Sequence, residues 1–308
     1  MSNIFIQNFK KENNNVFVNL PKQFTRHTMY KLLNRVIDND LNPMDNEIIF
    51  DFSTLDFIEP AGITILSNLF EWLDKRGVNT MINIPDSIKN RAPIKFLDDS
   101  MFFERYINQN LTTNPSIRNT TMPLALVSYE NSYQWLDSYF TVWLSRQLNV
   151  NQVSVVNIKM CIGEIFNNIK DHAQENIGCV FAQHYPNLNH IKITISDFGI
   201  GIPNNIKLLR PSLQDHYAIL LATDEGFTTR TSPRNLGAGL HTLIQNVVND
   251  NKGSVHIHSN YGILDCINGY TGLVKVPTLK NAFYPGTFIE IVLRTDTIEN
   301  IEEEEFEW

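Results

Sequence analysis

Three short segments in the second half of this chain constrain its fold more than any other feature of the sequence. Residues 164–172 read Glu-Ile-Phe-Asn-Asn-Ile-Lys-Asp-His and carry apolar residues at helical spacing. Residues 197–201 read Asp-Phe-Gly-Ile-Gly and follow an alternating, β-branched run. Residues 235–240 read Asn-Leu-Gly-Ala-Gly-Leu and precede a second helical pattern. Each segment alone is weak evidence, and the order of the three gives them weight.

The first segment places polar residues on one face of a helix. Glu164, Asn168 and His172 lie four residues apart and therefore share a face, while the opposite face is apolar. An amide oxygen such as that of Asn168 suits Mg²⁺, which takes oxygen ligands and keeps several waters. A carboxylate one turn away, Glu164, can accept a proton from water or from a hydroxyl. A plain hydrated surface is the alternative, and for His172 a structural role is favoured.

The second segment ends a predicted strand over residues 191–197. A carboxylate at that point, Asp197, can accept a hydrogen bond from the exocyclic amino group of adenine. Gly199 and Gly201 remove side chains, so that the backbone can turn sharply and approach a flat base. An ordinary turn after a strand would not need two spaced glycines and an aspartate.

The third segment begins a predicted helix with two glycines, Gly237 and Gly239. Free backbone N–H groups at the start of a helix favour phosphate. The pattern is neither the Rossmann fingerprint nor a P-loop, because G-x-x-x-x-G-K-[ST] is absent. A helix start with flexible glycines is the alternative, and the position after the other two segments favours phosphate.

Together these segments resemble the ATP site of the GHKL superfamily, which comprises gyrase, heat-shock chaperone, histidine kinase and mismatch-repair ATPases. The pattern is most similar to that of the bacterial anti-sigma-factor serine kinases. The resemblance implies that Glu164 is the general base, that Asn168 is the Mg²⁺ ligand and that Asp197 reads adenine. It also implies that residues 203–235 include an ATP lid and that Thr287 hydrogen-bonds near the adenine. Arg230 and Arg234 in this stretch could reach the terminal phosphate, although solvated arginines are the more frequent case in loops. The full set of expected ATP contacts is Asn168, Asp171, His172, Asp197, Gly199, Gly201, Arg230, Gly237, Ala238, Gly239, Leu240 and Thr287.

The N-terminal part alternates strand and helix signals. Strands are predicted at residues 16–20, 47–52 and 78–84, with helices at 26–38 and 61–75, which implies a βαβ unit. The run Phe-Asp-Phe-Ser-Thr-Leu-Asp-Phe-Ile-Glu-Pro-Ala-Gly at 50–62 is similar to the signature loop of STAS domains, the fold of anti-sigma-factor antagonists. Antagonists carry a phosphorylatable serine before that glycine. Ala61 stands there in this chain, so the resemblance implies the fold without a phospho-acceptor.

The predicted fold class is α/β. A STAS-like βαβ domain at residues 1–110 is followed by a linker at 111–123 that is rich in turn-forming residues. Residues 124–298 are expected to form a GHKL, or Bergerat, domain: a two-layer α/β sandwich whose mixed sheet has helices on one face. Predicted elements are helices at 128–148, 151–173, 215–223 and 237–249, and strands at 179–184, 190–197, 254–260, 273–276 and 287–294. Residues 299–308 form an acidic tail.

Composition narrows the function classes. A formal net charge of −8 argues against a general nucleic-acid or membrane-surface binder. Three widely spaced cysteines predict neither a disulfide framework nor a zinc site, and a zinc site at His256 and His258 lacks a third ligand. The N-terminus lacks the pattern of a signal peptide, and no apolar run approaches the length of a membrane span, so we expect a soluble cytoplasmic protein.

We therefore expect an ATP–Mg²⁺-binding signalling protein in which Glu164 activates either water, in an ATPase, or a partner's hydroxyl, in a serine/threonine kinase. The alternative is a non-catalytic, nucleotide-gated module that recruits a protein partner through the STAS-like domain. The sequence does not decide whether the chain forms a homodimer. A sensor histidine kinase is disfavoured, since the chain shows no dimerisation helix with a phosphorylatable histidine.

Overall fold

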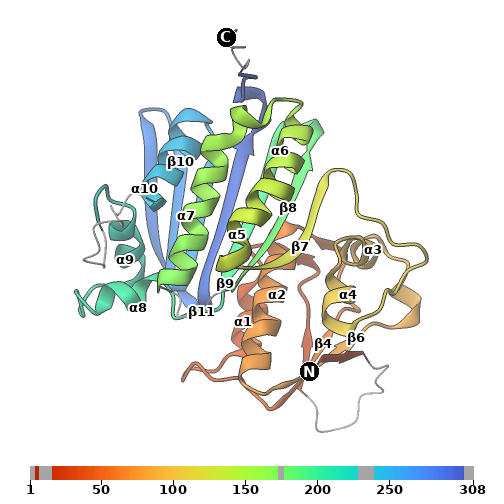
Figure 1. Ribbon diagram of the computed structural model, residues 1–308. Helices are drawn as coiled ribbons and strands as arrows, with labels where there is room; N and C mark the ends of the chain where they lie inside the picture. The colour runs from red at the N-terminus through yellow and green to blue at the C-terminus, as the bar shows by residue number, and fades with distance from the viewer. Residues whose placement is uncertain (1–3, 7–15, 173–176, 228–238, 302–308) are drawn as a thin grey trace.

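The computed structural model describes residues 4–6, 16–172, 177–227 and 239–301, and these form a mixed α/β protein (Figure 1). The N-terminal half contains a four-stranded sheet in the order β1-β6-β4-β2, in which every pairing is parallel. Helix α2 connects the neighbouring strands β4 and β6, which confirms the predicted βαβ unit. The elements of this half are β1 (Ile4–Ile6), β2 (Val16–Asn19), β3 (Gln23–Phe24), α1 (Tyr30–Val36), β4 (Glu47–Asp51), β5 (Phe57–Ile58), α2 (Pro60–Lys75), β6 (Asn79–Asn83), η1 (Asp86–Ile88), α3 (Ala92–Asp99) and α4 (Phe102–Ile107).

The second half contains a five-stranded sheet in the order β10-β11-β9-β8-β7. Each pairing in it is antiparallel, so the expectation of a mixed sheet is wrong for the described residues. Its strands are β7 (Thr121–Ser128), β8 (Ile177–Tyr185), β9 (His190–Asp197), β10 (Ser254–Gly269) and β11 (Gly272–Arg294).

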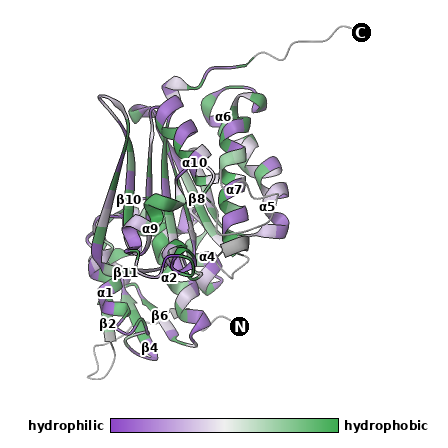
Figure 2. Ribbon diagram, turned by 90° about the vertical axis from the view of Figure 1, so that its left-hand side faces the viewer, coloured by the Kyte–Doolittle hydropathy of each residue, from purple (hydrophilic) through white to green (hydrophobic). Residues whose placement is uncertain are grey.

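Helices cover one face of this sheet (Figure 2). Ile191, Ile193 and Ile195 alternate along β9 and pack into the same core as Ile162 and Phe166 of α7. The elements of this half outside the sheet are α5 (Tyr129–Trp135), η2 (Leu136–Phe140), α6 (Thr141–Leu148), η3 (Gln152–Val155), α7 (Val156–His172), η4 (Pro186–Leu188), α8 (Ile202–Lys207), α9 (Asp215–Ala222), α10 (Gly239–Ile244), η5 (Gln245–Asp250) and η6 (Thr295–Thr297).

Several predicted boundaries differ from the observed ones. Residues 121–123, predicted as linker, begin β7. The helix predicted at 128–148 contains a π-helical stretch, η2, in which Tyr139 is 62 % exposed. Strands β10 and β11 form one long hairpin where shorter, separate strands were expected, because pairing with each other extends both.

The opposite face of the five-stranded sheet is covered by the N-terminal half. Helix α2 lies between the two sheets: Phe70 contacts Phe50 of β4, with ring centroids 4.9 Å apart, and Thr64 shares a 2.6 Å hydrogen bond with Thr194 of β9. The sequence pattern predicts one inward face for α2, yet nearly every residue from Pro60 to Leu73 is buried. The second contact surface comes from tertiary packing, and the two halves share one apolar core.

A buried polar network joins the halves beside α2. The guanidinium of Arg26 donates to Glu290 Oε1 at 2.9 Å and to Asp265 Oδ1 at 3.2 Å, while His256 Nδ1 lies 2.7 Å from the same Asp265 oxygen. Lys192 donates to Glu59 at 2.8 Å nearby. Burial raises the pKa of Glu290, against the opposing effects of Lys192 and Arg26, and burial lowers the pKa of His256.

Removal of Arg26 should leave the buried Glu290 carboxylate without its ion-pair partner. We expect Arg26→Met to lower the free energy of unfolding by about 3 kcal/mol at pH 7.5, since breaking one side of a buried ion pair is costly. We expect a smaller loss of unfolding free energy at pH 5.5. Without Arg26, the already raised pKa of Glu290 rises further, so the carboxyl group is more fully protonated at the lower pH. The stability that the protonated form provides is lost as the pH rises through that pKa. Urea unfolding at the two pH values measures both effects.

The control for this substitution removes both charges. Arg26→Met combined with Glu290→Gln should recover most of the loss at pH 7.5, because the more deeply buried of the two carboxylates that Arg26 contacts no longer carries a charge. An equal loss in the single and double variants would contradict the assignment of the cost to Glu290.

Among the described residues, no helix combines the length and the apolar character needed to cross a lipid bilayer.

Candidate functional site

Helix α7 presents the first predicted segment. Glu164 is exposed and Asn168, one turn later, is half-buried, so both reach the surface from one face. The Asn167 side chain donates to Glu164 Oε1 at 3.2 Å, and the Tyr133 hydroxyl donates to Asn167 at 3.4 Å. Asn167 thus contacts the carboxylate that the sequence singles out. Partial burial raises the pKa of Tyr133, with smaller contributions from Tyr129 and Glu164.

Gly239 brings the third segment against the first. A Cβ atom at Gly239 would lie 3.3 Å from Glu164 Cβ, 3.4 Å from Glu164 Oε2 and 3.5 Å from Asn168 Nδ2. The backbone at the start of α10 therefore runs directly beside the two side chains predicted to act on phosphate and metal. A methyl group at this position would lie slightly closer to Glu164 Cβ than side chains usually approach, and at ordinary van der Waals distance from the other two atoms.

Asp197 sits in a row of three residues that crosses the sheet. It pairs with Gly178 of β8 on one side and with Thr287 of β11 on the other. Its side chain is 6 % exposed, and Oδ1 accepts the Gly199 N–H at 2.8 Å. This hydrogen bond folds the Asp-Phe-Gly turn back onto the carboxylate and fixes its orientation.

Two glycines beside Asp197 allow close packing. A Cβ atom at Gly178 would lie 2.7 Å from the Ile169 Cδ1 atom of α7, so the row passes under the helix that carries Glu164 and Asn168. Gly286 has a φ of +82°, and a Cβ atom there would lie 2.2 Å from the Asp197 carbonyl oxygen. The structure thus brings the second segment next to the first, as well as next to residues 286–287.

Ser259 links three backbone segments at this end of the sheet, and the sequence gave no sign of it. Its Oγ donates to the Gly286 carbonyl at 2.8 Å, accepts the Ile202 N–H at 3.0 Å and lies 3.1 Å from Thr287 Oγ1. Gly201, with a φ of +83°, packs against Ser259 and Asn260, where the β10–β11 register shifts. A serine in a strand has no distinguishing pattern, so only the fold reveals this role.

The remaining predicted contacts fall into three groups. Leu240 is 8 % exposed and packs in the apolar core under α7, so its side chain serves packing. Asp171 and His172 complete α7, and the described part of the structure does not include their side chains. Arg230, Arg234, Gly237 and Ala238 lie outside the described residues.

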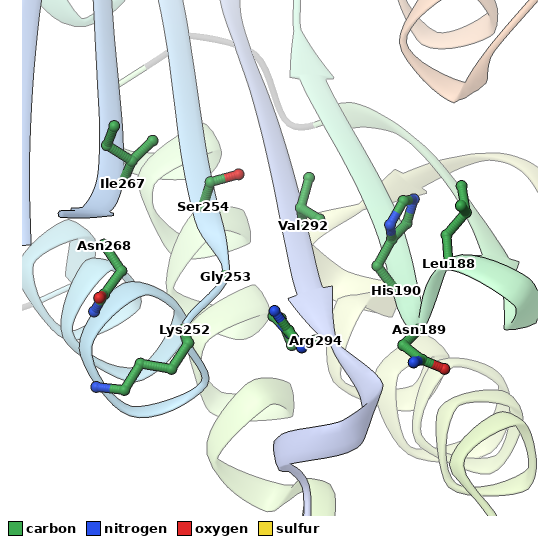
Figure 3. A pocket seen from close by; sticks show the side chains of 10 residues that line it. All are labelled: Leu188, Asn189, His190, Lys252, Gly253, Ser254, Ile267, Asn268, Val292 and Arg294. Carbon is green, nitrogen blue, oxygen red and sulfur yellow. The ribbon is translucent and has the colours of Figure 1, made fainter. Parts of the chain in front are cut away.

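A cavity of about 330 Å³ lies at the opposite end of the same sheet (Figure 3). It is bounded by His190 and Arg294, which pair at the far ends of β9 and β11 from Asp197 and Thr287. None of the predicted site residues lines it. Two cationic residues line the cavity, Lys252 and Arg294, and Arg294 pairs with Asp296.

Metal-binding clusters of His, Cys, Asp and Glu are absent from the described part of the chain. His256 and His258 are buried on the face that meets the N-terminal half, and burial lowers the pKa of His258 to about 3. They therefore belong to the interface network and its surroundings.

Comparison of the sequence with protein-family models and with curated proteins gave no match.

The close approach at Gly286 predicts a steric cost beyond that of its backbone conformation. Gly286→Ala should lower the free energy of unfolding by about 3 kcal/mol or more, because the left-handed conformation costs an L-residue about 1 kcal/mol and the new methyl group collides with Asp197. Gly77→Ala is the matched control, since Gly77 has a φ of +70° and nothing within 4 Å of its Cβ position. Equal losses in denaturant unfolding would show that Gly286 is not sterically required.

Proposed function

We propose that this chain is an ATP- and Mg²⁺-binding signalling protein with a GHKL-type ATPase or serine/threonine-kinase site. The observation that carries the proposal is the convergence of the three segments. Gly239 lies against Glu164 and Asn168, and Ile169 of the same helix lies over Gly178, the neighbour of Asp197. The fold therefore brings parts of the three segments, which are far apart in sequence, to one end of the sheet.

The donor set fits the proposed ligand. The buried Asp197 carboxylate, oriented by the Gly199 N–H, would accept the exocyclic amino group of adenine. Asn168 would hold Mg²⁺ through its amide oxygen. When bound, Mg²⁺ neutralises phosphate charge and aligns the terminal phosphate.

Glu164 has the position expected of a general base. It is exposed, so a water molecule or a partner's hydroxyl can reach it, and Asn167 contacts one of its oxygens while leaving the carboxylate at the surface. In this proposal Glu164 takes the proton of the attacking oxygen.

The hydroxyl acceptor of a kinase reaction would come from another molecule. Ala61, at the position of the antagonists' serine, is fully buried in α2. Helix α2 packs on the sheet face opposite α7, whereas Glu164 belongs to α7. The STAS-like loop of this chain therefore has no hydroxyl at that position and lies on the other face of the sheet from Glu164, so it does not suit self-phosphorylation. A separate protein partner or water is the acceptor that fits.

Binding tests the adenine part of this proposal. We expect wild type to bind ATP with Mg²⁺ in a calorimetric titration, and Asp197→Asn to weaken binding by roughly tenfold or more, since a hydrogen bond to a charged group contributes about 1.5–3 kcal/mol. Asp98→Asn is the control, because Asp98 is an equally buried acid that accepts N–H groups from Leu111 and Thr112 far from the site. Absence of binding by folded wild type would refute the proposal.

Turnover tests the role of Glu164 and separates the enzyme from the non-catalytic alternative. Glu164→Gln keeps the contact with Asn167 but cannot take a proton, so ATP affinity should stay within about twofold while turnover falls at least about 100-fold. Turnover is measured as phosphate release, alone and with candidate protein acceptors. Wild type that binds ATP without turnover in either assay would favour a nucleotide-gated interaction module, and full turnover by Glu164→Gln would exclude Glu164 as the base.

A further inference from the structure

Helix α2 of the N-terminal half lies directly behind the row formed by Gly178, Asp197 and Thr287. The row faces α7 on one side of the sheet, through the contact of Gly178 with Ile169. On the other side, α2 contacts a residue next to each member of the row or its turn. Ser67 donates to Cys179 Sγ at 3.4 Å, Lys75 Nζ lies 4.5 Å from the centre of the Phe198 ring, and Asn68 Nδ2 donates to the Pro285 carbonyl at 2.8 Å.

The hydrogen bond from Asn68 to Pro285 holds the turn at residues 285–287, which packs against Asp197. Pro285 precedes Gly286, whose Cα lies so close to Asp197 that no Cβ fits between them, and Thr287, which pairs with Asp197. Asn68 is fully buried, so its hydrogen bond is shielded from water and is costly to lose. A shift of α2 along the sheet would therefore move this turn.

Further buried hydrogen bonds connect the same places. The Tyr284 hydroxyl lies 2.9 Å from Ser196 Oγ, and Ser196 Oγ donates to the Thr287 carbonyl at 2.9 Å. Burial raises the pKa of Tyr284 well above its usual value, with hydrogen bonds from Ser196 and Asn68 acting in the opposite direction. Asn68, Tyr284 and Ser196 thus form one connected set behind Asp197.

We propose that Asn68 is a positioning residue for the nucleotide site, through which docking of the N-terminal half sets the affinity for ATP. The inference rests on the proposed function. Because energetic coupling is reciprocal, a partner that shifts α2 would change ATP affinity, and ATP would change the affinity for that partner. The N-terminal half then acts as a built-in regulator of the site.

Substitutions on α2 test this inference in the full-length chain. Asn68→Leu keeps the branched arrangement of side-chain heavy atoms but removes the donor, and it should weaken Mg²⁺–ATP binding about fivefold or more in calorimetric titration. Thr64→Val, one turn earlier, removes the hydrogen bond to Thr194 away from the row and should leave affinity within about twofold. Lys75→Met, at an exposed position that should fold readily, should weaken binding about twofold to threefold by removing the contact with Phe198.

Coupling to the turn distinguishes positioning from a general loss of stability. The effects of Asn68→Leu and Thr287→Val on ATP affinity should be non-additive, since both act through the same turn, whereas Thr64→Val and Thr287→Val should be additive. Equal changes of affinity in Asn68→Leu and Thr64→Val variants of equal stability would overturn the proposal.

Hydrogen exchange gives a readout that does not need nucleotide. Asn68→Leu should speed amide exchange in peptides covering residues 284–288 more than Thr64→Val does. If wild type binds no ATP but this difference appears, the proposed function fails while the positioning of the turn by Asn68 stands. If exchange is unchanged, or if it changes while ATP affinity does not, the regulatory inference is overturned.

Discussion

The burial of α2 between two sheets is the constraint on which the rest of the structure depends. One helix must present an apolar surface to β4 and β6 and a second surface to β8, β9 and β11, so its small and polar residues need partners inside the core. Thr64, Ser67 and Asn68 each hydrogen-bond to the second sheet or its turn. Gly62 permits the close approach of β3, because a Cβ atom there would lie 2.7 Å from the Phe24 carbonyl oxygen. The shared core makes the two halves a single packing unit, with a fold that differs from two independent domains on a linker.

Local elements of this fold could be predicted from the sequence because they depend on local periodicity. The β4–α2–β6 unit and helix α7 follow from apolar spacing and from glycine at the end of α2. The docking of the halves could not be predicted, because a helix with two buried faces shows the same amphipathic stripe as one with a single buried face until its polar residues find partners. Arg26 and Glu290 carry no mutual signal in the sequence, and only the fold brings them into contact.

The candidate site shows the same division. Glu164, Asn168, Asp197 and Gly239 could be singled out as candidates from the sequence, because their residue types and spacings form a recognisable local pattern. Gly178 and Ser259 were not, since a glycine or a serine within a strand has many ordinary explanations. Their roles come from tertiary contacts: Ile169 packs over Gly178, and the backbones of Gly286 and Ile202 hydrogen-bond to Ser259. Chemistry-bearing residues can be recognised in sequence more readily than the residues that hold them in place.

The row formed by Gly178, Asp197 and Thr287 is packed on both faces of the sheet. Helix α7 contacts it at Gly178, and α2 contacts the neighbouring Phe198 and Pro285 from the other side. A closely packed core resists gradual deformation, so a shift of α2 is transmitted to the turn at Gly286 instead of being absorbed locally. The interface network of Arg26, Glu290 and Asp265 holds the halves in one register near α2. Any change that weakens that network therefore acts on the same sheet that carries Asp197.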